Sequence, residues 1–283
     1  MRQGIKNLKQ YGFNTDYRTY IVAEIGINHG GDLQLAKKLI DAAGKAGADA
    51  VKFQTYLTEK RAPKGNKAVF DILKNCELPF DAFRVLKDHA GSREIDFFST
   101  PFDLESISFL EDIGCPRYKI ASFDTVNLNL LDALARTSKP IVMSTGMSSE
   151  EEVRRAYNLL LKGTKKITLL HCVSAYPITA KVANLATIRK LKSLFDCPVG
   201  SSAHTPDIQI PLYAVAAGAQ VVEKHLMLDE GMDCIDAPVS ITEVQMKDMV
   251  AEIRRIEVIF GEEYLGVRPV EELVTIFRRP SEI

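Results

Sequence analysis

The sequence predicts an α/β fold, a single-domain (β/α)8 TIM barrel with a short N-terminal extension. Three observations support this. Short apolar runs alternate with amphipathic stretches along most of the 283 residues, a pattern typical of parallel β–α units. Eight such runs occur, the number that closes this kind of barrel. No Gly-rich dinucleotide fingerprint follows any of them, which disfavours the alternative, an open doubly wound sheet.

The predicted strands are short, apolar and rich in β-branched residues, as expected for parallel strands that are buried on both faces. The first, Thr19–Gly26, leads into the turn cluster Asn28-His29-Gly30-Gly31-Asp32. The others are predicted at Ala48–Gln54, Ile95–Ser99, Arg117–Ala121, Pro140–Ser144, Ile167–Cys172, a stretch beginning with Pro198–Gly200, and Val221–Lys224.

Between the strands, apolar residues recur at helical spacing, as in LQLAKKLIDAAGKAG after the N-cap candidate Asp32. Further helices are predicted at Leu104–Ile113, Leu128–Arg136, Ser149–Lys162, Leu185–Phe195, Ile208–Ala217 and Ile241–Ile259. The second unit is interrupted, because the polar stretch Leu57–Phe80 contains Pro63 and Pro79. We predict a long loop there, and such loops often act as lids or binding elements.

Composition and charge exclude several classes of protein. The chain is 46% hydrophobic and 26% charged, and its formal net charge of −1 provides no field that attracts nucleic acid or anionic lipid. No apolar run reaches the roughly 20 residues that span a bilayer, and no signal-peptide core is present. The five cysteines are scattered without a CxxC pair, which fits reduced thiols. We expect a soluble cytoplasmic protein.

We divide the chain into three parts. Residues 1–17 are predicted to be an N-terminal extension, a strand or hairpin that closes one end of the fold. Residues 18–260 form the barrel domain, and residues 261–283 form a mostly polar C-terminal tail or linker.

Polar side chains follow the predicted strands at their carboxyl ends, where barrels of this type carry their reactive groups. They include Glu24, Asn28, Lys52, Gln54, Ser99, Thr100, Lys119, Ser122, Ser144, Thr145, His171, Ser174, Tyr176, Ser202, His204, Glu223, Lys224 and His225. We therefore expect a ring of functional groups around one mouth of the barrel.

Two of these residues, His204 in GSSAHT and His225 in VEKHLMLD, each follow a short apolar run. Neutral imidazole is a common metal ligand, and a divalent metal with open positions polarises carbonyl oxygens. Each could equally be an ordinary surface or core imidazole, because a metal site needs several ligands in a set geometry. His29 and His171 are further ligand candidates, whereas His89 lies in a polar helical stretch and is expected to be solvated.

Lys52 and Lys119 lie within predicted buried strands, where an ammonium group is costly without an anionic partner. They could form structural ion pairs with Glu24 or Asp124, or extend to the mouth. They could instead hold a phosphate or carboxylate together with strand-end serines. A Schiff base on one lysine, as in an aldolase, is a third reading. Glu24 would be a charge partner, or a general acid or base near a metal.

Seven stretches, in order, then carry a resemblance to a known family. They are IVAEIGINHGGDLQLAKKLIDAAGKAGADAVKFQTY, STPFD, YKIAS, KPIVMSTGM, LLHCVSAYP, GSSAHT and VEKHLMLD, and they span Ile21 to about Ile241. In them the chain resembles the sialic acid synthases, N-acetylneuraminate synthase and its relatives that make legionaminic and pseudaminic acids. Several long motifs in one order are more specific than any single motif.

The resemblance implies a transferase of carbohydrate biosynthesis that joins phosphoenolpyruvate to the open-chain aldehyde of an N-acylamino sugar resembling N-acetylmannosamine. It implies His204 and His225 as ligands of a divalent metal, Mn²⁺ or Mg²⁺. The acidic residues Glu24 and Asp236 would act with Lys52 and Lys119 in catalysis. The implied substrate-binding residues are Gln54, Thr100, Ser122, Asp124, Ser144, Ser174, Tyr176 and Ser202. A homodimer is a further possibility that the resemblance raises.

The sequence departs from the family pattern at several positions. Ala203 stands where an acidic neighbour of the metal histidine is usual, and Asp124 is one methylene shorter than the usual glutamate. Asp233-Cys234-Ile235 replaces Pro-Gly-Pro. Family members usually continue into an antifreeze-like domain near the point where this sequence stops, and that domain contributes an arginine to the partner subunit's sugar site.

Two alternatives therefore stay open. One is a different phosphoenolpyruvate-condensing enzyme, or a Schiff-base aldolase, that acts on another aldehyde. The other is a catalytically weakened homologue that binds a ligand or partner.

Overall fold

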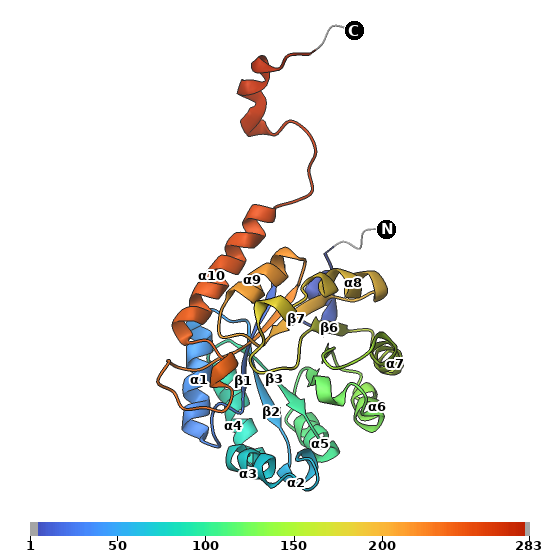
Figure 1. Ribbon diagram of the computed structural model, residues 1–283, viewed down its shortest axis with the longest axis vertical. Coiled ribbons are helices and arrows are strands. Elements are labelled where there is room, and N and C mark those ends of the chain that lie inside the picture. The colour runs from blue at the N-terminus through green and yellow to red at the C-terminus, as the bar shows by residue number, and fades with distance from the viewer. Residues whose placement is uncertain (1–4, 281–283) are drawn as a thin grey trace.

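Eight parallel strands form a closed barrel in the computed structural model, which describes residues 5–280 (Figure 1). They are β1 (Tyr20–Gly26), β2 (Ala50–Thr55), β3 (Asp96–Pro101), β4 (Tyr118–Ile120), β5 (Ile141–Ser144), β6 (Ile167–His171), β7 (Val199–Ala203) and β8 (Val221–His225). They pair in chain order, and β8 closes on β1, which leaves no open edge. The predicted fold class is confirmed.

Helices surround this barrel, and most of them bury their apolar faces against it (Figure 1). They are α1 (Leu33–Ala46), α2 (Thr58–Arg61), α3 (Lys67–Cys76), α4 (Phe80–Ser92), α5 (Leu104–Asp112), α6 (Leu128–Arg136), α7 (Glu150–Leu160), α8 (Ala186–Leu194), α9 (Gln209–Ala216) and α10 (Glu243–Phe260). The predicted N-cap of α1 is confirmed, since the Asp32 carboxylate accepts hydrogen bonds from the N–H groups of Gln34 and Leu35.

The segment Leu57–Phe80 is not the long loop that its composition predicted. It contains α2 and α3, and α4 begins at its last residue. The prediction was wrong because the prolines lie between helices rather than inside them: Pro63 follows α2, and Pro79 immediately precedes α4. Leu73 and Cys76 of α3 are buried against Ile27 and Tyr56, so tertiary packing stabilises this amphipathic helix.

Residues 5–17 form no strand or hairpin, contrary to the prediction. They contain the short 3₁₀ helix η1 (Leu8–Tyr11), which ends at Gly12 with a φ of 86°. Phe13, 2% exposed, packs on Tyr20 at a ring-centroid distance of 4.8 Å. Arg117 lies over the Phe13 ring and donates a hydrogen bond to the Gly12 carbonyl. The segment therefore covers the amino-terminal ends of the strands.

Beyond α10, residues 261–280 extend away from the barrel (Figure 1). They include the 3₁₀ helix η5 (Pro269–Phe277), which has no buried residue. The segment presents more apolar surface than the predicted polar tail would, since Leu265, Val270 and Leu273 are all highly exposed. The Arg18 guanidinium donates a hydrogen bond to the Gly261 carbonyl at 2.5 Å.

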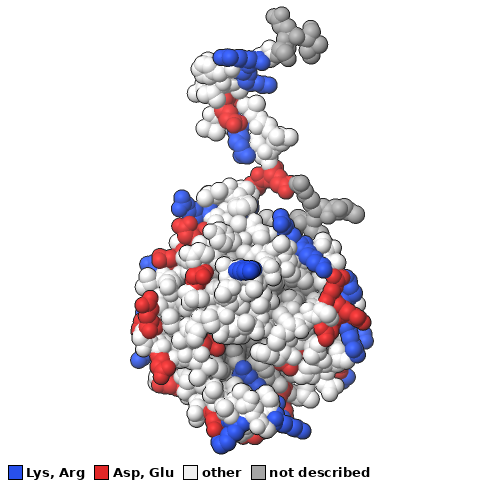
Figure 2. Space-filling model, viewed as in Figure 1, with Lys and Arg blue, Asp and Glu red and all other residues white. Residues whose placement is uncertain are grey.

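The surface and the cysteines agree with the composition. Basic and acidic side chains are interspersed around the face shown in Figure 2, and neither sign dominates it. All five cysteines are free thiols. Within residues 5–280, no helix combines the length and the apolar character that crossing a bilayer requires.

Candidate active site

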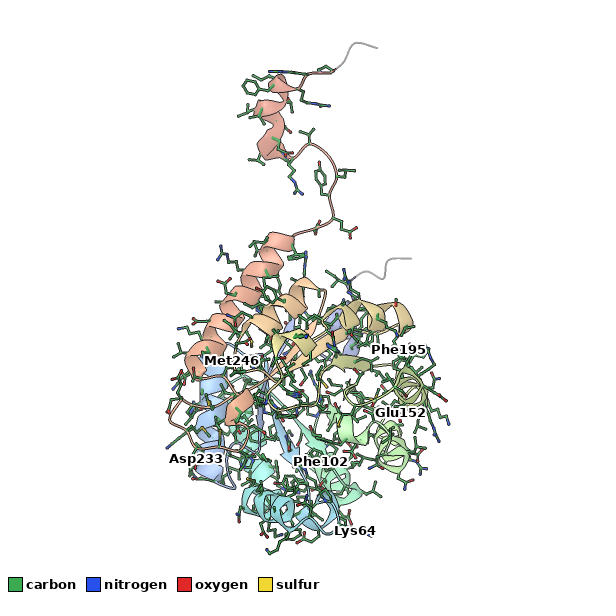
Figure 3. The ribbon with its side chains drawn as sticks, viewed as in Figure 1. Lys64, Phe102, Glu152, Phe195, Asp233 and Met246 are labelled. Atoms are coloured by element: carbon green, nitrogen blue, oxygen red, sulfur yellow. The ribbon has the colours of Figure 1, made fainter. Side chains whose placement is uncertain are left out.

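One cavity of about 240 Å³ opens at the carboxyl ends of the strands. It brings together all of the site residues that the family resemblance implied except Asp124, whereas Asn28, Ser99, Thr145, His171 and Lys224 of the predicted ring do not line it. Those that line it are Glu24, Lys52, Gln54, Thr100, Lys119, Ser122, Ser144, Ser174, Tyr176, Ser202, His204, His225 and Asp236. Phe102, labelled in Figure 3, directly follows β3 and also lines this cavity.

Two buried lysines and two buried carboxylates lie together on the cavity wall, and all four are less than 5% exposed. Lys52 Nζ lies 2.8 Å from Glu24 Oε2 and 3.8 Å from Glu223 Oε1. Lys119 Nζ lies 3.4 Å from the same oxygen of Glu223 and donates a hydrogen bond to Ser144 Oγ at 2.7 Å. Each ammonium therefore has a carboxylate partner, and each still lines the cavity, where it can meet an anionic ligand.

This arrangement shifts the pKa values of three of these four groups. Burial alone would lower the pKa of Lys52, but Glu223 and Glu24 outweigh it and raise that pKa. For Lys119, burial lowers the pKa by more than the negative charge of Glu223 raises it, so the pKa is lowered. Burial opposes ionisation of Glu223, but Lys119 and Lys52 outweigh it and lower the pKa of this carboxyl. Lys52 and Glu223 are therefore both ionised at neutral pH.

Hydroxyl groups converge where the backbone after β5 comes close to the cavity. A Cβ atom at Gly146 would lie 2.4 Å from Ser174 Oγ, 2.8 Å from Ser122 Oγ and 2.8 Å from Cys172 Sγ. Only glycine leaves these side chains where they are. Hydroxyl and ammonium groups donate the hydrogen bonds that phosphate and carboxylate oxygens accept. This part of the cavity thus has the chemistry of an anion site.

The two predicted metal ligands lie side by side, with ring centroids 5.7 Å apart, and both are buried. His204 Nδ1 donates a hydrogen bond to the Val173 carbonyl at 2.8 Å, so its Nε2 carries the lone pair and accepts from the Tyr176 hydroxyl at 3.1 Å. Burial lowers the pKa of His204 to about 4, which keeps this imidazole neutral at pH 7. His225 Nδ1 lies 3.4 Å from Asp236 Oδ2.

These donors fit a divalent cation. His225 Nδ1 is a buried nitrogen without a hydrogen bond among the described residues, and His204 Nε2 is held as an acceptor. In residues 5–280, no three His, Cys, Asp or Glu side chains are gathered so that they would hold a metal by themselves. A bound ion would therefore need water or substrate oxygens to complete its coordination. Ala203 supplies no carboxylate, and the Val173 carbonyl orients His204 instead.

Several predicted positions lie elsewhere. Asp124 does not line the cavity, and its carboxylate accepts a hydrogen bond from Asn127 at 3.0 Å. His29 and His171 are also outside the cavity and hydrogen bond to nearby backbone groups. His89 is not solvated as predicted, because its Nε2 lies 2.9 Å from a carboxylate oxygen of Asp41 on the neighbouring helix.

Sequence reasoning missed two charged residues of the cavity. Glu223 was noticed but assigned no role, although it lies two positions before His225 and so shares its face of β8. Arg61, at the end of α2, was not singled out at all. Its guanidinium lies over the rings of Tyr56 and Phe102, at 4.4 and 4.0 Å from their centroids. No local signal could have found it, because its position depends on how α2 packs.

Comparison with known proteins then gives consistent matches. Residues 39–264 match the NeuB family. An N,N'-diacetyllegionaminic acid synthase of Campylobacter jejuni is 40% identical over 261 residues, which are 87% of this chain and 78% of the relative. A pseudaminic acid synthase of the same species is 34% identical over 264 residues, 88% of this chain and 77% of the relative.

Among solved structures, the crystal structure of an N-acetylneuraminic acid synthetase from Leptospira borgpetersenii matches with a TM-score of 0.89. Its sequence is 39% identical, and the match covers 92% of this chain and 91% of that one.

Proposed function

The chain belongs to the NeuB family, and we propose that it condenses phosphoenolpyruvate with the open-chain aldehyde of an N-acylamino sugar. The products would be a sialic-acid-type 3-deoxy-2-keto acid and phosphate. The names of the legionaminic and pseudaminic acid synthases support this reaction class. The observation that carries the proposal is that two lysines and two histidines, from four different strands or their carboxyl ends, line one cavity. An anion pocket and a carbonyl-activating group there would face the same reacting atoms.

Phosphoenolpyruvate would bind against the wall formed by Lys52 and Lys119. Their ammonium groups, already held by Glu24 and Glu223, would donate to its carboxylate and phosphate oxygens. Hydroxyl groups would supply the remaining donors, from Thr100, Ser122, Ser144, Ser174 and Ser202. Because these donors are positioned before the substrate arrives, little reorganisation is needed as charge develops.

The sugar aldehyde would lie beside His204 and His225. We propose that the two imidazoles, with Asp236 next to His225, hold a divalent cation, Mn²⁺ or Mg²⁺. When bound, such a cation acts as a Lewis acid on the carbonyl oxygen. The Tyr176 hydroxyl, 3.1 Å from His204 Nε2, would keep that ring in place until the ion binds.

Carbon–carbon bond formation would begin with attack of the enol carbon on the aldehyde carbon. The aldehyde oxygen takes up a proton and becomes a hydroxyl, and the neighbouring carbon of phosphoenolpyruvate, which bears the phosphate oxygen, becomes an oxocarbenium centre to which water adds. Glu24 would accept the proton that the water loses, since its Oε1 is fixed by a 3.0 Å hydrogen bond from Gln54 Nε2. Cleavage of the carbon–oxygen bond to phosphate then leaves the keto group.

A phosphate-release assay tests this proposal. The protein is incubated with phosphoenolpyruvate, Mn²⁺ and a panel of N-acylhexosamines, with and without a chelator. We expect phosphate release that requires both an N-acyl sugar and the metal. Borohydride trapping of a substrate on Lys52 or Lys119 would instead favour a Schiff-base aldolase. Binding of phosphoenolpyruvate without turnover on any sugar would indicate a weakened homologue.

A further inference from the structure

Arg61 differs from the other cations of the cavity because it has no ionic partner. Lys52 and Lys119 each lie within 3.4 Å of a carboxylate oxygen. The guanidinium of Arg61 forms no ion pair among the described residues, and its Nη1 is buried without a hydrogen-bond partner. A buried donor of this kind is costly to leave unsatisfied. We therefore expect Nη1 to donate a hydrogen bond to an acceptor on a bound ligand.

Its position is fixed by the aromatic rings around it. The guanidinium carbon lies 4.4 Å from the centroid of Tyr56 and 4.0 Å from that of Phe102, both within the range of cation–π attraction. Tyr56 is itself anchored, since its hydroxyl donates a hydrogen bond to the Leu73 carbonyl at 2.8 Å. Arg61 is thus held over the cavity by the α2–α3 segment.

The charges around Arg61 distinguish between ligands. Three carboxylates interact electrostatically with its guanidinium: Asp236 after β8, Glu24 on β1 and Asp124 after β4. Glu24 is already paired with Lys52, so Arg61 is the cation that balances Asp236 and Asp124. Without Arg61, a sugar with a free ammonium group would be attracted.

We propose that Arg61 selects the acceptor sugar by its acyl group. Its Nη1 donates a hydrogen bond to the acyl carbonyl oxygen, and its charge disfavours a sugar with a free amine. The acceptor that this residue selects is therefore an N-acylated rather than a free amino sugar. This inference rests on the proposed function, because it concerns how that reaction chooses its second substrate.

The test compares Arg61→Ala with the wild-type protein on N-acetylmannosamine, its 6-phosphate and mannosamine, with phosphoenolpyruvate as cosubstrate. We expect kcat/KM for the neutral N-acetylated sugar to fall about 10- to 100-fold, since a charge-assisted hydrogen bond is lost. The preference for the acetylated over the free amino sugar should fall by a similar factor. The KM for phosphoenolpyruvate should stay within about twofold.

Further variants sharpen the test. Arg61→Lys keeps the charge but loses the planar fork, so it should still exclude mannosamine while binding the acetylated sugar weakly. Arg61→Gln serves if the alanine variant melts early. Lys60→Ala is the matched control, because Lys60 is the exposed neighbour that pairs with Glu105 instead, and it should leave every constant unchanged.

Two results would overturn the inference alone. One is turnover by Arg61→Ala with an unchanged preference and a raised KM for phosphoenolpyruvate, which would assign the guanidinium to that substrate. The other is a wild-type preference for the 6-phosphate that Arg61→Ala abolishes. Absence of turnover by the wild-type protein on every sugar would overturn the proposed function and this inference together.

Discussion

The carboxylate of Glu223 connects the two lysines of the cavity. Its Oε1 lies 3.8 Å from Lys52 Nζ and 3.4 Å from Lys119 Nζ, and it accepts a hydrogen bond from Ser202 at 3.0 Å. An anionic substrate therefore meets two ammonium groups that are already positioned and share a counter-ion. Any substitution in this group changes the charge balance of the others, so its effects will not be additive.

Replacing Lys52 by alanine removes one of these ammonium groups from a buried position. A single positioned charge-stabilising group is worth about 3–4 kcal/mol of barrier. We therefore expect Lys52→Ala to lower kcat for phosphate release a hundredfold or more. Lys38→Ala, an exposed lysine on α1, is the matched control and should leave kcat unchanged. An ordinary rate for Lys52→Ala would contradict the assignment of Lys52 to phosphoenolpyruvate.

His29 makes stability depend on pH. Its side chain is 1% exposed, and burial lowers its pKa from 6.5 to about 4. Between these two values the unfolded chain binds a proton that the folded chain does not, so stability is lost as the pH falls from 6.5 to 4. The loss approaches about 3 kcal/mol at the lower end.

Urea midpoints of the wild-type protein and His29→Gln, measured across this pH range, check the prediction. The stability difference between them should shift in favour of the variant as the pH falls, because the variant lacks the titrating group. Parallel pH dependences for the two proteins would show that His29 does not carry the effect.

The short helix α2 owes its position to a carboxylate on the following unit. Asp103 Oδ2 accepts a hydrogen bond from the Leu57 N–H at 2.9 Å, just before α2. Its Oδ1 accepts from the Ser106 N–H at 2.7 Å and caps α5. One buried side chain thus connects the element that carries Arg61 to the β3–α5 junction.

We expect Asp103→Ala to cost about 1–2 kcal/mol of stability, the usual effect of losing an N-cap, and also to raise the KM for the sugar. Ser149→Ala is the matched control: it removes the capping box that Ser149 forms with Glu152, labelled on α7 in Figure 3, far from α2. Thermal melts measure the loss of stability in both variants, and steady-state kinetics show whether the KM for the sugar rises in Asp103→Ala alone. An unchanged sugar KM in Asp103→Ala would show that α2 does not need this contact.

The molecule as a whole has one open and one covered end. Residues 5–17 pack over the amino-terminal ends of the strands, whereas the carboxyl ends surround the cavity. The segment after α10 neither covers the amino-terminal ends of the strands nor lines the cavity (Figure 1). We accordingly keep the proposed boundary of the barrel domain at residue 260.

A chain that ends at Gly261 tests this boundary and keeps the contact with Arg18. Residues 262–280, which this chain lacks, are almost all exposed, and changes at exposed positions shift stability by about 0.5 kcal/mol or less. We expect the melting temperature to move by only about 1–2 °C, measured by circular dichroism. A drop of about 10 °C or more would mean that the segment belongs to the folding unit.

The eight strands and most of the helices were predictable because their signals are local. Apolar β-branched runs and helical spacing do not depend on distant residues, and the carboxyl ends of parallel strands must meet at one mouth. The sequence by itself therefore determined the barrel and the residues around its opening.

Only the tertiary structure decided which of these residues interact. Lys119 pairs with Glu223 rather than with the nearby Asp124, because barrel closure brings the far end of the chain to the inside of β4. Arg61 reaches the cavity because α2 and α3 pack as helices where the prolines suggested a loop. Ion pairs and burial of this kind depend on strand register and helix packing between segments distant in sequence, and no local pattern encodes them.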